Sequence, residues 1–263
     1  MHLFLIRHGE TVDNVAGLYA GSRDSALTSH GVLQAHRLAT HLAEKASLQH
    51  VFASNLQRAA RTAEAIVAEQ KQVYLLDTPV VQLASLRERD FGSDEGVKFS
   101  GKGRVGSDAE TAESMTARVD DFLDTHLVPL LGLESSTELS LTCAIVAHGI
   151  ILGVLYKSLC ARVNRGGMTI DRTLSSSGPG AVASAFSSPF WDNTGYLECT
   201  LSVTTTASRP KSWNLHVKQV NCVSHLRDLK KTRGGIGSAA HDDKQQTLTS
   251  FFPVASEKHK VGE

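Results

Sequence analysis

The stretch LFLIRHG, residues 3–9, runs from four apolar residues into a cation, an imidazole and a glycine. In open α/β sheets, ligands bind beyond the carboxyl ends of the strands. At such a position Arg7 offers a planar fork of donors that suits phosphate oxygens. A neutral His8 has one ring nitrogen that can attack, provided that a backbone carbonyl holds the other N–H. These residue types indicate nucleophilic phosphoryl chemistry, although for the triplet alone a solvated Arg–His pair is an equal alternative.

Two further features fit the same chemistry. The triplet A-H-G at 147–149 ends another apolar run and repeats the strand–His–Gly arrangement. Arg58 opens a predicted helix, and a helix N-terminus beside a guanidinium is a natural anion site. Taken singly, His148 could be a helix-start residue and Arg58 a surface arginine. Two His–Gly turns after two apolar runs in one chain favour the chemical interpretation.

The ordered motifs resemble the histidine phosphatase superfamily, in its phosphoglycerate-mutase-like branch. The shared motifs are R-H-G-E-T-x-x-N at 7–14, D-S-A-L-T-x-x-G-x-x-Q-A at 24–35, S-x-L-x-R-A at 54–59, L-R-E-R-x-F-G-x-x-E-G at 86–96, A-E-T at 109–111, A-H-G at 147–149 and N-T-G at 193–195. The resemblance covers roughly residues 1–230.

The resemblance implies a role for each matching residue. His8 is expected to be the nucleophile that becomes phosphohistidine, Glu88 the general acid and then the base for water, and His148 a second catalytic histidine. The phosphoryl group is expected to be bound by Arg7, Asn14, Gly21, Arg58 and Thr194. Phosphoryl transfer needs charge stabilisation on the equatorial oxygens, which two arginines and a protonated His148 supply without metal or cofactor.

The acid is expected to be Glu88 rather than the alternative, Glu10, because of its F-G-x-x-E-G context. Taken alone, Glu88 between two arginines could be part of a solvated charge cluster. To begin the reaction protonated, Glu88 must be buried or face the substrate phosphate. We therefore expect Arg87 and Arg89 to point away from it, or to bind a second anionic group.

The substrate is expected to be a small phosphorylated molecule. Mutases of the branch carry a basic insertion after F/Y-G-x-x-E-G, and the segment VKFSGKGR at 97–104 is shorter and different. The closest resemblance is to stand-alone fructose-2,6-bisphosphatases, which implies a sugar-phosphate phosphatase. The alternatives are a broad-specificity acid phosphatase and a phosphoglycerate mutase. Lys98, Lys102 and Arg104 are either solvated loop charges or contacts to a second phosphate.

The elements that must position these residues alternate between strands and helices. Strands are predicted at 2–6, 50–53, 73–76, 142–147, 196–203 and 213–221. Helical periodicity is found at 32–45, 59–67, 110–131 and from 150 onward, with Thr28 as an N-cap. Loops are predicted at 96–107 and 171–190. The alternation predicts an α/β fold of the phosphoglycerate-mutase type, a three-layer sandwich whose mostly parallel central sheet has helices on both faces.

Composition narrows the class of protein. The 27 basic and 27 acidic residues balance, which argues against direct nucleic-acid binding or attraction to an anionic membrane. No apolar run reaches the roughly 18–20 residues that span a bilayer, and the first strand has no signal pattern before it. The spacing of the four cysteines fits buried thiols in a reducing compartment better than a zinc site or disulfides. We expect a cytoplasmic protein, and a nuclear one as well if the basic residues at 227–233 aid import.

The apolar pattern stops near residue 232, so we expect a catalytic domain at 1–231 and a flexible tail at 232–263. Residues 245–252 fit Q-x-x-L-x-x-F-F, which resembles the PIP box that docks on the replication sliding clamp, PCNA. The expected clamp-binding residues are Gln245, Leu248, Phe251 and Phe252. The alternative is that the two phenylalanines fold back onto the domain.

Overall fold

The computed structural model describes residues 1–99, 106–137, 140–164, 166–171, 189–206, 209–230 and 236–242. Within them, seven strands form one sheet in the order β3-β2-β4-β1-β6-β7-β5. Their bounds are β1 His2–Arg7, β2 His50–Ser54, β3 Val80–Leu83, β4 Thr142–Ala147, β5 Met168–Ile170, β6 Tyr196–Thr206 and β7 Arg209–Cys222. β1 to β4 are mutually parallel, whereas β6 is antiparallel to both β1 and β7.

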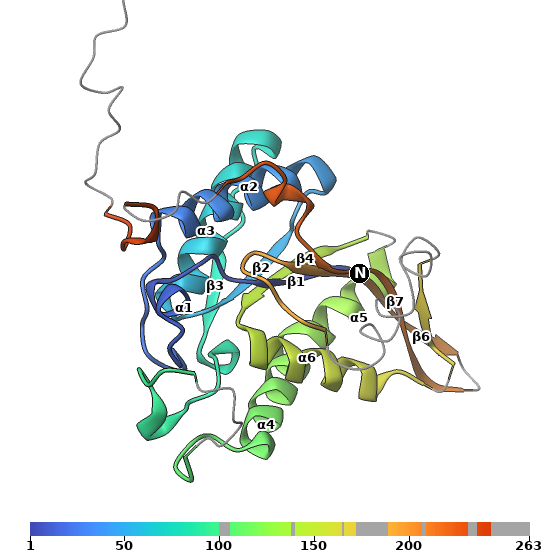
Figure 1. The fold of residues 1–263 in the computed structure, drawn as a ribbon. Helices are drawn as coiled ribbons and strands as arrows, with labels where there is room; N and C mark the ends of the chain where they lie inside the picture. Colours follow the sequence, from blue (N-terminus) through green and yellow to red (C-terminus); the bar gives the residue numbers. More distant parts are fainter. Residues whose placement is uncertain are drawn as a thin grey trace, which may run out of the picture.

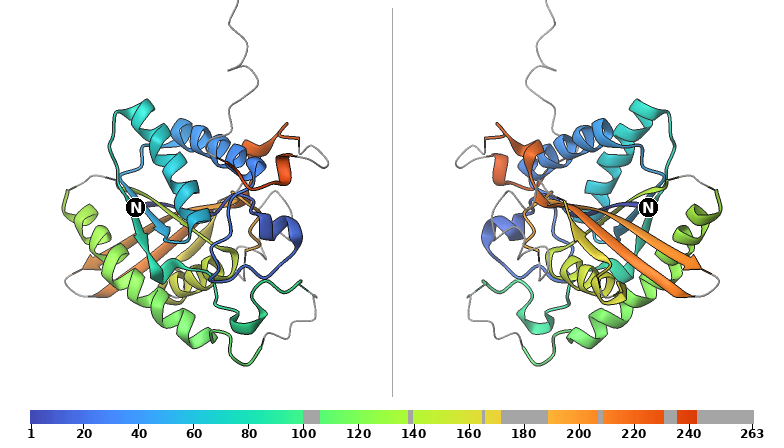
Figure 2. Two further views of the ribbon diagram at one scale, coloured as in Figure 1. Left: turned by 90° about the vertical axis from the view of Figure 1, so that its left-hand side faces the viewer. Right: turned by 90° about the vertical axis from the view of Figure 1, so that its right-hand side faces the viewer.

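Helices cover both faces of the sheet, and this gives the three layers that the sequence predicts (Figure 1). α2 (Ser29–Lys45) and α3 (Gln57–Tyr74) lie on one face, and α4 (Ala112–Phe122) and α6 (Gly149–Arg162) on the other (Figure 2). Strand β1 needs helices on both faces, because its apolar side chains alternate between the two faces of the sheet. Phe4 and Ile6 pack with Leu38 of α2, while Leu3 and Leu5 belong to the core that includes Phe122 of α4.

Parallel pairing brings the chemistry-bearing strand ends to one edge. Arg7 of β1 is in register with Ala147 of β4, and Ala53 of β2 with Val146. The residues that follow these three strands therefore emerge side by side. A short helix, α1 (Val12–Ala16), follows β1, and Thr28 caps α2 as predicted by accepting the N–H of Gly31.

The strand predicted at 73–76 is wrong. Helix α3 continues to Tyr74, whose hydroxyl donates to the carbonyl of Ala43 on α2, and Leu75 is a left-handed C-cap with φ 55°. The apolar, β-prone letters VYLL thus belong to a helix end, because packing of α3 on α2 outweighs local propensity. The third strand is β3 at Val80–Leu83, a half-exposed edge strand of only four residues, which is too short to show a clear pattern.

The helix predicted over 110–131 is interrupted. After α4 the chain makes a π-helical turn at Leu123–Leu127, in which Val128 donates to the carbonyl of Leu123, and α5 then runs over Val128–Thr137. Pro129 follows at once and has no N–H, so the regular i→i−4 ladder could not have continued there. The predicted apolar face is nevertheless buried in the core.

Part of the segment expected to be a tail contacts the domain. His241 donates its backbone N–H to the carbonyl of Leu27, and Ser29 donates to the carbonyl of Ala239. These bonds join residues 236–242 to the start of α2. The remainder of the predicted tail lies outside the described residues, as do residues 100–105 of the loop predicted at 96–107 and residues 172–188 of the loop predicted at 171–190. Among the described helices, none combines the length and apolar character needed to cross a bilayer.

Candidate active site

The two His–Gly turns meet at the edge formed by β1 and β4. The backbone N–H of His8 donates to the carbonyl of Ala147 at 3.1 Å. The imidazole rings of His8 and His148 lie edge to face, with centroids 5.0 Å apart. Both side chains are buried. The register of two parallel strands therefore brings together two histidines that are 140 residues apart in the chain.

His8 has a defined tautomer. Its Nδ1 lies 2.7 Å from the carbonyl of Gly9, and since a carbonyl only accepts, Nδ1 carries the proton. Burial, followed by the charges of Arg58 and Arg7, holds the pKa of His8 well below its usual value. The ring is therefore neutral, and Nε2 keeps a lone pair. This is the state that a nucleophile requires.

His148 is neutral in the opposite tautomer. Nε of Arg58 donates to its Nδ1 at 3.1 Å, and a ring nitrogen that accepts a hydrogen bond carries no proton. Burial and the neighbouring Arg58 hold the pKa of His148 well below its usual value. A protonated His148 is expected for its role beside a bound phosphoryl group, whose negative charge would favour the protonated form, and that expectation stays a prediction. The proton of the neutral ring is on Nε2.

Arg58 is buried and holds the loop that precedes α2. Its Nη1 donates to the carbonyl of Arg23 and its Nη2 to the carbonyl of Gly21, both at 2.7 Å. Burial lowers the pKa of Arg58 to about 10, so that the guanidinium stays charged at neutral pH. Gly21 thus contributes a backbone carbonyl that fixes Arg58. Arg58 in turn orients His148.

Two buried donors at the site have no acceptor among the described residues, Nε of Arg7 and Nε2 of His148. Nη1 of Arg7 is held by the carbonyl of Trp191 at 2.6 Å. A Cβ added to Gly149 would lie 4.0 Å from Nε of Arg7, which places this guanidinium at the turn that follows His148. Buried donors without acceptors are uncommon, and a phosphate oxygen would satisfy both.

Asn14 and Thr194 fix the backbone around His8. Asn193 donates its amide to the carbonyl of His8 at 3.2 Å and to Oδ1 of Asn14 at 3.0 Å. The backbone N–H of Thr194 donates to the same His8 carbonyl, and its buried hydroxyl contacts Nε2 of His225 at 2.9 Å. Thr194 thus hydrogen-bonds the His8 backbone directly, and Asn14 is linked to it through the amide of Asn193. The hydroxyl of Thr194 is already bonded to His225.

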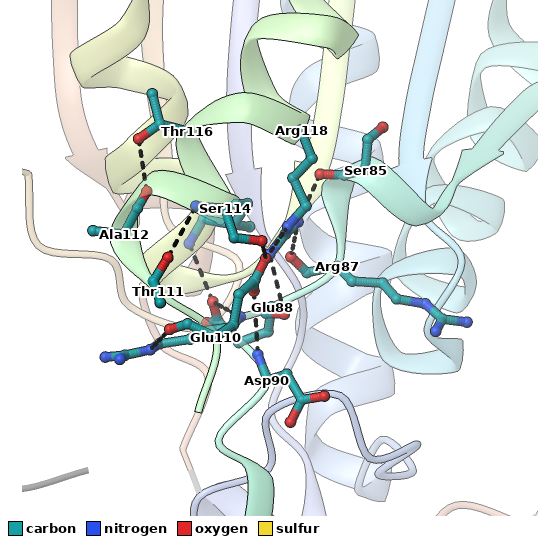
Figure 3. A network of polar contacts seen from close by, with 12 residues as sticks. Ser85, Arg87, Glu88, Asp90, Glu110, Thr111, Ala112, Ser114, Thr116 and Arg118 are labelled. Atoms are coloured by element: carbon teal, nitrogen blue, oxygen red, sulfur yellow. Dashed lines mark hydrogen bonds and ion pairs between the residues drawn. The ribbon is translucent and has the colours of Figure 1, made fainter. Parts of the chain in front are cut away.

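Glu88 caps the helix that begins after His148. Its carboxylate accepts the backbone N–H groups of Ile150 and Ile151, each at 3.1 Å. The neighbouring arginines bond elsewhere, as expected: Nε of Arg87 donates to Asn55 and Nε of Arg89 to the carbonyl of Glu110. Figure 3 shows the Arg87 side chain directed away from Glu88. The structure thus joins Glu88 to the same helix start that carries His148.

The alternative acid, Glu10, precedes α1 in the chain and contacts the N-cap of α2. Its Oε1 accepts the hydroxyl of Thr28 at 2.9 Å. Of the basic loop residues, Lys98 lies at an isolated bridge with Leu18. Lys102 and Arg104, together with the clamp-binding candidates Gln245, Leu248, Phe251 and Phe252, lie outside the described residues. Within the described ranges, no group of three or more His, Cys, Asp or Glu side chains is arranged to hold a metal ion.

Sequence reasoning missed Arg118, which binds the Glu88 segment from α4. The guanidinium contacts the carboxylate of Glu110 and the carbonyls of residues 85, 87 and 88. A signal was present, because Glu110 belongs to the A-E-T motif that ends at Thr111, the N-cap of α4, and Arg118 lies in that same helix.

Comparison with known proteins gives a consistent result. Residues 3–170 match the model of the histidine phosphatase superfamily (branch 1). A probable phosphatase of Schizosaccharomyces pombe is 32% identical over 256 residues, which cover 94% of this chain and 78% of that protein. The probable fructose-2,6-bisphosphatase TIGAR A of Danio rerio is 34% identical over 46% of this chain and 51% of its own length. A phosphoglycerate mutase structure from Bacillus anthracis superposes with a TM-score of 0.57 at 19% identity, covering 86% of this chain and 95% of the mutase.

Proposed function

The chain belongs to branch 1 of the histidine phosphatase superfamily, and we propose that it hydrolyses phosphomonoesters through a phosphohistidine on His8. The observation that carries this proposal is the pairing of tautomers. His8 offers a lone pair on Nε2, while His148 Nε2–H and Arg7 Nε are buried donors without acceptors among the described residues. A nucleophile beside two uncommitted donors suits attack on a phosphoryl group.

The reaction has two steps. In the first, Nε2 of His8 bonds to phosphorus, the ester P–O bond breaks, and a protonated Glu88 gives its proton to the leaving oxygen. In the second, water attacks the phosphohistidine, its proton passes to the Glu88 carboxylate, and the N–P bond breaks to release inorganic phosphate. Arg7 and His148 stabilise the oxygens in both steps, and Arg58 acts through His148 and the loop at Gly21.

We further propose a sugar phosphate as substrate, with fructose 2,6-bisphosphate as the first compound to test. Support comes from the L-R-E-R and N-T-G motifs and from the identity with the Danio rerio protein. Broad-specificity phosphatase and phosphoglycerate mutase activity are the alternatives. A mutase would isomerise phosphoglycerate in a reaction that depends on a bisphosphate primer, whereas a phosphatase releases inorganic phosphate.

Trapping the intermediate tests the proposal. Wild-type protein is mixed with a ³²P-labelled phosphomonoester and quenched, and the label is followed at acid and alkaline pH. An acid-labile label that is lost in His8→Ala supports the proposal, and His36→Ala, at an exposed histidine of α2, should label normally. No acid-labile label in wild type, or full activity in His8→Ala, would refute it.

Clamp binding through residues 245–252 is a separate, sequence-based proposal. It is supported by the Q-x-x-L-x-x-F-F pattern alone. A pull-down with PCNA, comparing wild type with the Phe251→Ala/Phe252→Ala variant, tests it. Equal recovery of both proteins, or recovery of neither, would remove the proposal without touching the phosphatase activity.

A further inference from the structure

The segment that carries Glu88 is held by a side chain of α4, the helix against which the preceding turn at Ala84–Leu86 packs. Nη1 of Arg118, on α4, donates to the carbonyls of Ser85 and Arg87, each at 2.7 Å. Its Nη2 reaches the carbonyl of Glu88 itself at 3.3 Å. One guanidinium therefore binds three carbonyls within four residues. Figure 3 shows Arg118 reaching from its helix onto this segment.

Glu110 fixes the direction of that guanidinium. Its two carboxylate oxygens accept Nε and Nη2 of Arg118 at 2.8 and 2.9 Å, a two-pronged geometry that only a planar fork can make. The same residue binds the segment on the other side of Glu88, since its backbone N–H donates to the carbonyl of Asp90 and its own carbonyl accepts Nε of Arg89. Arg118 and Glu110 thus hold the segment before and after Glu88.

The backbone of Glu88, fixed in this way, sets where its carboxylate can reach. The carboxylate contacts the N–H groups of Ile150 and Ile151, one turn from His148. The pair is well shielded, with side-chain exposures of 20% for Arg118 and 14% for Glu110, so water competes weakly for these bonds. A displacement of about 1 Å in a proton donor can cost on the order of 100-fold in rate.

We propose that Arg118 and Glu110 are positioning residues for the general acid, placing Glu88 so that it can protonate the leaving oxygen. The inference rests on the proposed function. Arg118 and Glu110 bind each other and the backbone on both sides of Glu88, so we expect them to act on the reaction mainly through Glu88, although the charge of Arg118 also contributes to the lowered pKa of His148. Their contribution should therefore depend on how much the leaving group needs a proton.

The experiment compares two substrates in Arg118→Lys and Glu110→Gln. p-Nitrophenyl phosphate releases a stable phenolate that needs little protonation, whereas glycerol phosphate releases an alkoxide that needs a full proton. We expect kcat/KM for glycerol phosphate to fall on the order of 10- to 100-fold, and that for p-nitrophenyl phosphate to fall less than about threefold. Glu88→Gln should show the same split more strongly.

The control is Arg162→Lys. Arg162 also has 20% side-chain exposure and also pairs with a residue of α4, Asp120, but it lies at the far end of α6 from His148. It should lower both activities equally or not at all. In a Glu88→Gln background, Arg118→Lys should reduce glycerol phosphate turnover by less than about threefold further, because a residue that acts through Glu88 has nothing left to position.

Equal losses on both substrates in Arg118→Lys and Glu110→Gln would overturn the inference and indicate a structural role, as would unchanged activity on both. If Arg118→Lys fails to fold, Glu110→Gln, which keeps the shape of the side chain and loses only its charge, gives the deciding ratio. Failure of the proposed function is visible separately, because wild type would then form no acid-labile phosphoprotein with either substrate.

Discussion

Nε of Arg58 donates to Nδ1 of His148 across 3.1 Å, and this bond decides which ring nitrogen of His148 carries the proton. On the neighbouring His8 the carbonyl of Gly9 makes the opposite choice, because it binds the proton on Nδ1. The two Nε2 atoms therefore differ, one with a lone pair and the other with a proton. The first can attack phosphorus, and the second can donate to a phosphate oxygen.

The tautomers can be read directly. In ¹⁵N-histidine-labelled protein at pH 7, long-range ¹H–¹⁵N spectra should show a neutral Nδ1–H ring for His8 and a neutral Nε2–H ring for His148. Arg58→Lys removes the Nε donor, so the His148 signals should move toward a mixture of tautomers, and activity should fall on the order of 100-fold or more. Two protonated nitrogens on His148 in wild type would contradict the assignment.

Alanine substitutions at two glycines distinguish the cost of a positive φ from the cost of a steric clash. Gly17 and Gly21 both have positive φ, at 67° and 53°. A Cβ on Gly17 would meet nothing within 4 Å, whereas on Gly21 it would overlap the carboxylate of Glu95 and lie 2.8 Å from the ring of Phe91. Gly17→Ala should therefore cost about 1 kcal/mol of stability with normal kcat/KM.

Gly21→Ala should cost at least about 2 kcal/mol of stability and lower kcat/KM at least about 10-fold, because the Gly21 carbonyl holds Nη2 of Arg58. Chemical denaturation and steady-state kinetics on both variants give the comparison. If the two alanine variants behaved alike, the close approach of Glu95 to Gly21 would have no energetic consequence.

The parts of the fold that sequence predicts well are those in which local pattern and tertiary position agree. Continuous apolar runs predict β1 and β4, and the family resemblance implies that His8 and His148 meet at one phosphoryl group, which agrees with the parallel register of the two strands. Thr28 combined a capping side chain with a periodic helix and was identified for the same reason. In these cases the neighbours in sequence are enough to determine the structure.

Sequence-based predictions fail where residues distant in the chain determine the local structure. The run at 73–76 is β-prone, yet packing of α3 against α2 keeps it helical through Tyr74. The tautomer of His148 depends on Arg58, which lies 90 residues away. Arg118 binds backbone carbonyls, which every residue has. The residue types in the segment 85–88 therefore give no sign that an arginine binds there. Such bonds are fixed by the tertiary arrangement rather than by motifs.

Acid should destabilise the protein partly through His225. Burial, with a smaller contribution from His41, lowers the pKa of His225 to about 4, while in the unfolded chain it titrates near 6.5. Between these values the unfolded state binds a proton that the folded state excludes, so stability is full above pH 6.5 and declines as pH falls toward 4. Tyr196 and Thr194 also face this ring, and neither is charged in that window.

Wild type should therefore lose about 1–2 kcal/mol more unfolding free energy between pH 7 and pH 5 than His225→Gln does. Denaturant titrations at the two pH values measure this difference, and His36→Gln, at an exposed histidine, is the matched control. An equal loss in wild type and His225→Gln would show that His225 is not responsible.

Two truncations locate the end of the folded domain. Residues 239–241 bind the backbone of Leu27 and Ser29 on either side of Thr28, the N-cap of α2. Ending the chain after Lys230 removes these bonds, whereas ending it after Asp242 keeps them. At about 1 kcal/mol for each hydrogen bond, the shorter chain should lose about 2 kcal/mol of stability relative to the longer one. Because α2 packs beside the loop that carries Gly9, the shorter chain should also show lower phosphatase activity. The longer chain should match the full protein in stability and in activity.

Denaturant titrations and steady-state assays of the three proteins test this prediction. Equal stability of the two truncated chains would instead place the domain boundary at 231, where the sequence pattern puts it.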